Sequence, residues 1–122
     1  MFEIRVEKTI AAAHRLFGYD GPCETLHGHN YRVEVAYGGT ELDQFGMLVD
    51  FTDVKKAFHA VLDTLDHTYL NELPAFHDVS PSAENIAKQL YDELADTLAS
   101  PRAAIKEVRV WETDVQYAVY RP

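Results

Sequence analysis

The 122-residue chain is long enough for one domain with a single hydrophobic core and too short for two, so we expect residues 1–122 to fold as one unit. Hydrophobic residues make up 47% of the sequence and charged residues 25%, which is ordinary globular usage and excludes a long solvated tail. The formal net charge of −9 disfavours a nucleic-acid partner, because a polyanion would be held against net repulsion, although a local cationic pocket could still bind a small anionic substrate.

The first predicted element is a strand over residues 2–12. Apart from Lys8, its even positions are apolar, while its odd positions carry polar side chains such as Glu3 and Arg5. This alternation is typical of a strand with one buried face. His14 continues the apolar phase of the strand.

A second strand is predicted over residues 27–37, with its apolar phase on the odd positions, starting at His27 and His29. Because successive side chains of a strand alternate, both imidazoles project from one face, about 7 Å apart, and can converge on one atom. Gly28 between them leaves that approach unobstructed, and the Gly-Gly pair that follows predicts a turn at the end of the strand.

Two helices are predicted next. Asp50 is expected to cap a helix whose apolar residues, three and four apart, run from Phe51 to Leu65. Ser80 and Pro81 are expected as the N-cap and first residue of a second helix, whose apolar side runs from residue 83 to residue 98.

Two strands, residues 105–113 and 115–120, complete the chain, and Glu112 occupies the phase of Val108 and Val110. The order strand, strand, helix, helix, strand, strand predicts an α+β fold with a four-stranded antiparallel sheet and both helices on one face. The other face could meet solvent or line a water-filled channel in an oligomer. Its expected residues are polar and paired in sign: Glu3, Arg5, Glu7, Arg32, Glu34, Glu107 and Arg109.

His14, His27 and His29 share the apolar phase of two neighbouring strands. Three neutral imidazoles suit a tetrahedral zinc ion with a fourth position left open, which is the geometry of catalytic zinc. The alternative is that any one of them is a core histidine with a backbone partner.

Cys23 is the only cysteine of the chain. It could be a fourth ligand, which would make the zinc structural, or a thiolate base or nucleophile beside an open zinc, or an inert buried thiol.

The sequence also bears on the compartment in which the protein works. One cysteine cannot form an internal disulfide. No apolar run approaches the roughly 20 residues that span a bilayer, and the N-terminus lacks the apolar centre of a signal peptide. We therefore expect a cytoplasmic protein with no membrane partner.

Two acidic residues and one histidine near the ends of a predicted helix and a predicted strand could also take part in catalysis or binding. Asp66 and His67 close the first predicted helix, where they could be a surface cap or, if the carboxylate fixes the imidazole tautomer, a proton relay. Glu112 could accept two parallel N–H donors from the guanidine-like edge of a heterocycle, or lie at a strand end open to water.

Six blocks of the sequence resemble, in order and over essentially the whole chain, the signature blocks of the 6-pyruvoyl-tetrahydropterin synthase family. They are AAAHRL from Ala11, CETLHGHNY from Cys23, GMLVDF from Gly46, LDHTYLN from Leu65, PSAEN from Pro81 and WETD from Trp111. The resemblance implies a tunnelling fold, in which three subunits close their sheets into a barrel and two trimers stack as a homohexamer. The polar sheet face would then line the tunnel.

The resemblance also implies roles for individual residues. Sites of this kind are similar to pockets between subunits, so Asp66 and His67 would serve a neighbour's zinc. The implied zinc ligands are His14, His27 and His29; the implied proton-transfer residues are Cys23, Asp66 and His67; and the implied pterin-binding residues are Glu112, Ser82 and Ala83.

Within the family, the three residues between Cys23 and His27 resemble the 6-carboxy-tetrahydropterin synthase branch, whereas the end of the chain is nearer the pyruvoyl branch. The implied function is a zinc lyase that converts 7,8-dihydroneopterin triphosphate to 6-carboxy-5,6,7,8-tetrahydropterin, acetaldehyde and triphosphate, in queuosine and 7-deazaguanine biosynthesis. The alternatives are a 6-pyruvoyl-tetrahydropterin synthase, which stops after triphosphate elimination, and a non-catalytic zinc-stabilised domain that binds pterins or a protein partner.

Overall fold

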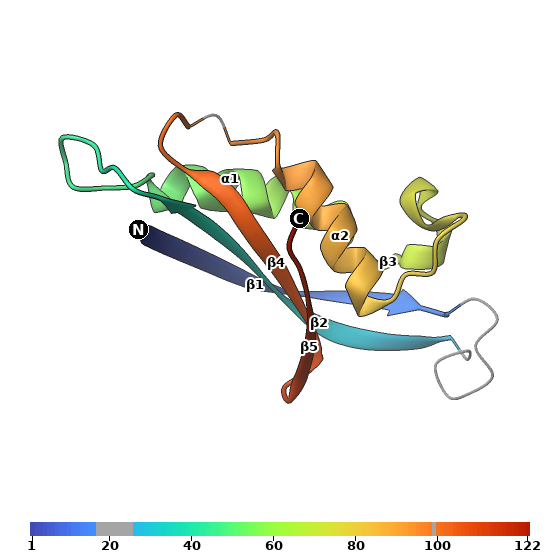
Figure 1. Ribbon diagram of the computed structural model, residues 1–122. Helices are drawn as coiled ribbons and strands as arrows, with labels where there is room; N and C mark the ends of the chain where they lie inside the picture. The colour runs from blue at the N-terminus through green and yellow to red at the C-terminus, as the bar shows by residue number, and fades with distance from the viewer. Residues whose placement is uncertain (17–25, 99) are drawn as a thin grey trace.

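The computed structural model describes residues 1–16, 26–98 and 100–122 (Figure 1). Its sheet has the strand order β3-β1-β2-β4-β5, and both α-helices lie on one face of it. The α+β class and the placement of the helices are therefore as predicted. The elements are β1 (Phe2–His14), β2 (His27–Gly39), α1 (Phe51–Leu62), β3 (Thr68–Tyr69), 3-10 turns at Leu70–Glu72 and Pro74–Phe76, α2 (Ala83–Leu94), β4 (Ala104–Thr113) and β5 (Gln116–Tyr120).

The four predicted strands are antiparallel neighbours, and β3 adds a fifth that the sequence did not predict. β3 pairs parallel to β1, with Thr68 opposite Ala12 and Tyr69 opposite Ala13. Two residues are too short to produce a periodic signal in the sequence. The pairing nevertheless fastens the segment after α1 to the outer edge of β1.

The core lies between the sheet and the helices, and the predicted strand phases hold. Val33, Val35, Val108 and Val110 are fully buried, as is Phe58 of α1. β2 runs through the Gly-Gly pair to Gly39 rather than ending before it. β1 and β2 pair without interruption, from Phe2 opposite Gly39 to His14 opposite His27. The alternation of side chains between the two faces of the sheet therefore continues as far as the histidines.

The helix caps match the prediction for α1 and differ for α2. Asp50 caps α1 by accepting a hydrogen bond from the amide of Thr52 at 2.8 Å. The prediction of Ser80 and Pro81 as the start of α2 is wrong: Ser82 is the N-cap, and its hydroxyl accepts from the amide of Asn85 at 3.2 Å. Both serines have the right chemistry, but only Ser82 lies three residues before an amide of the first turn that needs a partner.

α2 also ends at Leu94, earlier than the predicted apolar side that runs to residue 98. None of the helices in the described ranges is long and apolar enough to cross a membrane.

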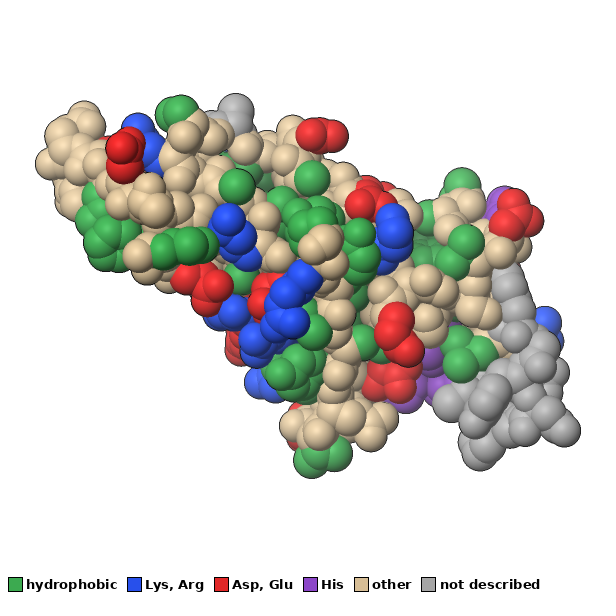
Figure 2. Space-filling view, viewed as in Figure 1, with side chains coloured by type: hydrophobic (Ala, Val, Ile, Leu, Met, Phe, Trp, Pro, Cys, Tyr) green, Lys and Arg blue, Asp and Glu red, His purple; other side chains and the backbone are tan. Residues whose placement is uncertain are grey.

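The opposite face of the sheet carries an ordered charge network, with acidic and basic side chains side by side (Figure 2). Glu107 is 5% exposed and accepts hydrogen bonds from Arg5 at 3.1 Å, Arg109 at 2.5 Å and Arg121 at 2.9 Å. Arg5 also donates to Glu34 at 2.5 Å. Five of the seven polar residues predicted for this face therefore pair with one another, namely Glu3, Arg5, Glu34, Glu107 and Arg109.

Candidate metal centre and substrate cleft

The three predicted histidine ligands come together at one end of the sheet. His14 and His27 are direct cross-strand partners, and His29 lies two residues further along β2. Their ligand nitrogens all lie within 4.8 Å of one another, and the Nε2 atoms of His14 and His27 are 2.9 Å apart. Two nitrogens on one tetrahedral zinc ion would be about 3.3 Å apart, given Zn–N bonds of about 2.0–2.1 Å. The rings are thus arranged as a shared divalent ion requires.

The tautomer of His14 is set by the backbone. Its Nδ1 lies 2.6 Å from the carbonyl oxygen of Pro81, which can only accept a hydrogen bond, so Nδ1 carries the proton. The Nε2 lone pair is then directed at the other two histidines. A metal-bound imidazole is oriented by this kind of contact, and nothing in the sequence indicated that Pro81 would provide it.

His29 fits a metal ligand for a different reason. Its Nε2 is buried and has no hydrogen-bond partner among the described residues. Burial lowers the pKa of His29, and the nearby charge of Glu112 only partly opposes this. The ring is therefore neutral, and a buried neutral nitrogen without a partner is explained if it binds an ion. Together the three imidazoles fit a divalent metal.

Glu112 lies beside this centre, at an irregularity of its strand. The β4–β5 pairing passes from Trp111 opposite Tyr117 to Thr113 opposite Gln116, which leaves Glu112 as the extra residue of a β-bulge. Its carboxylate is 23% exposed and lies 3.9 Å from Nε2 of His14. Glu112 keeps the core-facing phase of Val108 and Val110, and His14 is buried on that same face.

Glu112 and Ala83, two of the predicted substrate residues, line one cleft of about 390 Å³. Ser82 directly precedes Ala83, but its hydroxyl is used to cap α2. In Figure 2, histidine side chains gather beside acidic ones at this end of the molecule. The sequence did not single out the other residues of the cleft, which are Glu84, Gln116, Tyr117, Ala118 and Val119.

Asp66 and His67 lie after the end of α1 rather than in it, and both are attached to the edge of β1. Asp66 accepts from the amide of Ala11 at 2.9 Å, and the amide of His67 donates to the carbonyl of Ala11 at 2.6 Å. His67 has φ of 58°, and its side chain is 82% exposed. Its Nε2 is 3.7 Å from the Asp66 carboxylate, an ion-pair distance that is long for a hydrogen bond.

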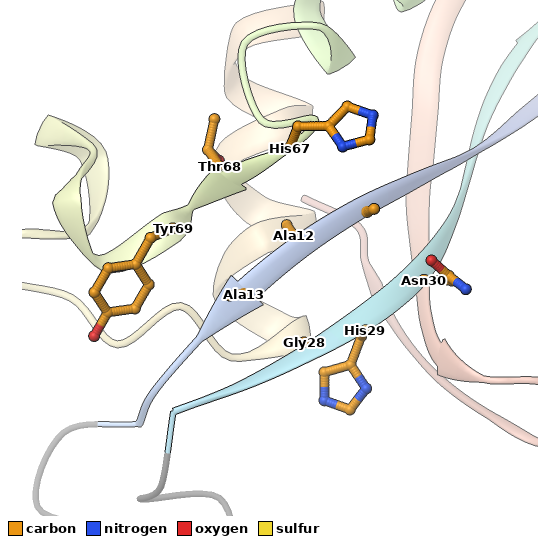
Figure 3. Close-up of a pocket in the computed structure, with 9 residues that line it drawn as sticks. Ala12, Ala13, Gly28, His29, Asn30, His67, Thr68 and Tyr69 are labelled. Carbon is orange, nitrogen blue, oxygen red and sulfur yellow. The ribbon is translucent and has the colours of Figure 1, made fainter.

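His67 does not join the three-histidine cluster of its own chain. It lines a groove of about 530 Å³ with Thr68 and Tyr69, over small residues of β1 and β2. Figure 3 shows the rings of His67 and His29 on opposite sides of the β1–β2 pair. Among the described residues, the metal cluster contains His14, His27 and His29 alone. The predicted role of Cys23 falls outside the described residues and stays a prediction.

The fold and site define a class of protein: a small α+β domain with three imidazoles that could hold a metal ion at the end of a sheet, next to a cleft that contains a carboxylate. The model of one family, described as 6-pyruvoyl tetrahydropterin synthase, matches residues 3–122. The chain belongs to this family, as the sequence blocks predicted.

Individual relatives agree with this assignment. The 6-carboxy-5,6,7,8-tetrahydropterin synthase of Bacillus subtilis (strain 168) is 37% identical over 129 residues, which cover 99% of this chain and 86% of that protein. The 6-pyruvoyl tetrahydrobiopterin synthase of Poecilia reticulata is 40% identical over 97 residues, 78% of this chain and 65% of that protein. The structure of Caenorhabditis elegans 6-pyruvoyl tetrahydropterin synthase aligns with a TM-score of 0.90 and 29% identity, over 99% of this chain and 95% of that chain.

Proposed function

We propose that this chain is a zinc-dependent lyase that converts 7,8-dihydroneopterin triphosphate and water into 6-carboxy-5,6,7,8-tetrahydropterin, acetaldehyde and triphosphate. The observation that carries the proposal is the position of Glu112, which lines the cleft 3.9 Å from His14 of the metal centre. A pterin ring bound to Glu112 would present its side chain to the bound metal. The reaction would belong to queuosine and 7-deazaguanine biosynthesis in the cytoplasm, with residues 1–122 acting as one domain.

Two observations favour the carboxy product over the pyruvoyl one. The Bacillus subtilis relative named for the carboxy product aligns with 99% of this chain, whereas the Poecilia reticulata relative named for the pyruvoyl product aligns with 78%. The three-residue spacing between Cys23 and His27 points the same way. The 40% identity of the Poecilia reticulata relative makes a 6-pyruvoyl-tetrahydropterin synthase the second candidate.

His14, His27 and His29 would hold the zinc ion. When bound, zinc supplies Lewis acidity that lowers the pKa of the substrate's side-chain hydroxyls. Pro81 keeps the proton of His14 on Nδ1, and burial keeps His29 neutral, so both rings are ready to bind metal. Glu112 would accept two N–H groups of the pterin ring and so fix which substrate carbon lies at the site. Cys23, as a thiolate, would remove a carbon-bound proton.

Asp66 and His67 would complete the site from a neighbouring copy. In the described ranges, β1 pairs on its outer side only at Ala12 and Ala13, and β5 has no strand on its outer side. Two open edges of one sheet can pair head to tail and close a ring of copies, and two such rings would stack as a hexamer. The exposed His67 on the β1 edge would then face the β5 edge of the next copy and relay protons there.

The test is product analysis of the purified, zinc-loaded chain with 7,8-dihydroneopterin triphosphate. Mass spectrometry should detect 6-carboxy-5,6,7,8-tetrahydropterin, and alcohol dehydrogenase with NADH should detect an equal amount of acetaldehyde. A pyruvoyl product without acetaldehyde would establish the second candidate instead.

Cys23→Ala is the matched variant. It should keep its zinc and its pterin affinity while losing turnover, because the thiolate is a base and not a ligand in this proposal. Loss of zinc from this variant would make Cys23 a fourth ligand. A wild-type chain that binds zinc and pterin without turnover would be a non-catalytic pterin-binding domain.

A further inference from the structure

The carbonyl of Pro81, which sets the tautomer of His14, belongs to a short segment that Asn85 holds from both sides. Nδ2 of Asn85 donates to the carbonyl of Ser80 at 2.9 Å. The backbone amide of Asn85 donates to the hydroxyl of Ser82 at 3.2 Å. Pro81 lies between these two contacts and is buried. One residue of α2 therefore bridges the chain on either side of the carbonyl that meets the histidines.

Few rotations remain that could turn the Pro81 carbonyl. The pyrrolidine ring fixes φ of Pro81 at about −65°. On the C-terminal side, Ser82 is the N-cap of α2, with φ of −69° and ψ of 162°. On the N-terminal side, Ser80 has neither a ring nor a cap position, and there the side chain of Asn85 holds its carbonyl. The Asn85 side chain therefore completes the set of contacts that fix the direction of the Pro81 carbonyl.

The direction of this carbonyl matters to the candidate metal centre. The Pro81 oxygen lies 2.6 Å from Nδ1 of His14, whose side chain is only 1% exposed, and Nε2 of the same ring is 2.9 Å from Nε2 of His27. A carbonyl that turned away would no longer keep the proton on Nδ1 or the ring in its present orientation. Losing an outer partner of a metal-binding histidine typically weakens metal binding about 10–100-fold.

We propose that Asn85 is a positioning residue of the candidate metal centre, which holds the Pro81 carbonyl against His14 and so prepares the three imidazoles for a divalent ion; this rests on the proposed function. The role requires the Nδ2 donor, because the carbonyl of Ser80 can only accept. Asn85 lies in the first turn of α2, where a helix by itself favours a carboxylate. The contact with Ser80 explains why an amide is present there instead.

The test measures the zinc affinity of the full-length chain by competition with a chelator. Asn85→Asp keeps the shape of the side chain and suits the first turn of a helix, but it places an oxygen against the Ser80 carbonyl. It should bind zinc about tenfold more weakly than wild type, even though its added negative charge would by itself favour a cation. Its zinc-free form should unfold at the same urea concentration as wild type or a higher one.

Two further variants complete the comparison. Asn85→Ala, which removes the donor without adding a charge, should also bind zinc about tenfold more weakly. Gln89→Ala is the matched control, because it removes another side-chain amide of α2, which donates to Glu93 at 2.9 Å. It should keep its zinc affinity within about twofold of wild type.

The outcomes separate this inference from the proposed function. Wild-type zinc affinity in Asn85→Asp would overturn the positioning role and leave the proposed function standing. A zinc-free Asn85→Asp chain that unfolds at clearly lower urea would mean that Asn85 supports the fold as a whole, which would also overturn the positioning role. Zinc binding that depends on Asn85, without turnover of 7,8-dihydroneopterin triphosphate, would overturn the proposed function alone. A wild-type chain that binds no zinc would overturn both.

Discussion

Replacing Glu107 with glutamine should destabilise the folded chain by about 3 kcal/mol at pH 7. Burial by itself raises the pKa of Glu107, but the hydrogen bonds from Arg5, Arg109 and Arg121 outweigh it and lower the pKa from 4.5 to about 2. This difference corresponds to about 3 kcal/mol of interaction that only the ionised carboxylate makes. Glutamine fills the same space and leaves the three guanidinium groups without their shared counter-charge.

The effect has a defined pH dependence. Because the pKa of Glu107 is lower in the folded state than its ordinary value of 4.5, its stabilisation is present at pH values above 4.5 and is lost as the pH falls through about 2. About 2 kcal/mol should already be lost at pH 3. Since glutamine does not titrate, the difference in free energy of unfolding between wild type and Glu107→Gln should shrink from about 3 to about 1 kcal/mol between pH 7 and pH 3.

Urea unfolding followed by the fluorescence of Trp111, the one tryptophan, measures this difference at each pH. Histidine protonation affects both proteins alike and cancels in the comparison. Glu3→Gln is the matched control, because its side chain is 42% exposed and contacts Arg5 at 2.9 Å at the edge of the network. It should cost less than about 1 kcal/mol. A Glu107→Gln effect that does not change with pH, or is no larger than that of Glu3→Gln, would refute the reasoning.

Three further outcomes are expected. Gly39→Ala should destabilise the chain by about 3 kcal/mol in the same urea assay, because the added Cβ would lie 2.0 Å from the carbonyl oxygen of Arg102, which side-chain rotation cannot relieve. His29→Ala should reduce bound zinc, measured by elemental analysis after dialysis, from one per chain to near zero while the far-ultraviolet circular dichroism stays unchanged. Mixing inactive Cys23→Ala and His67→Ala chains after mild dissociation should restore part of the turnover if the site is shared between copies, and no recovery would place both residues in one subunit's site.

The convergence of the three histidines was predictable because it depends on local periodicity. Period-two alternation puts His27 and His29 on one face, and the apolar phase of the first strand carries His14 to the same face once the two strands pair. Asp50 was predictable as a cap for a similar reason, since its partner is the amide of Thr52, two residues away.

Features that depend on contacts between distant segments were not predictable. The start of α2 depends on which of two serines reaches a free amide, and Ser82 rather than Ser80 does so. The sequence predicted the alternation that contains Glu112 but not the β-bulge at this residue, because the bulge depends on how β5 pairs with β4. The fifth strand is only Thr68–Tyr69, which has no periodic signal.

By itself, the sequence determined the alternation of the strands, the amphipathic helices and the set of candidate metal ligands, because each of these depends on residues a few positions apart. Only the tertiary structure decided that Pro81 sets the tautomer of His14, that Asp66 and His67 are held on the outer edge of β1, and that Glu107 is surrounded by three arginines. In each of those cases a polar group takes its partner from a segment brought close by folding. No local pattern of side chains specifies such a partner, because the strength of a hydrogen bond depends on distance and direction in space.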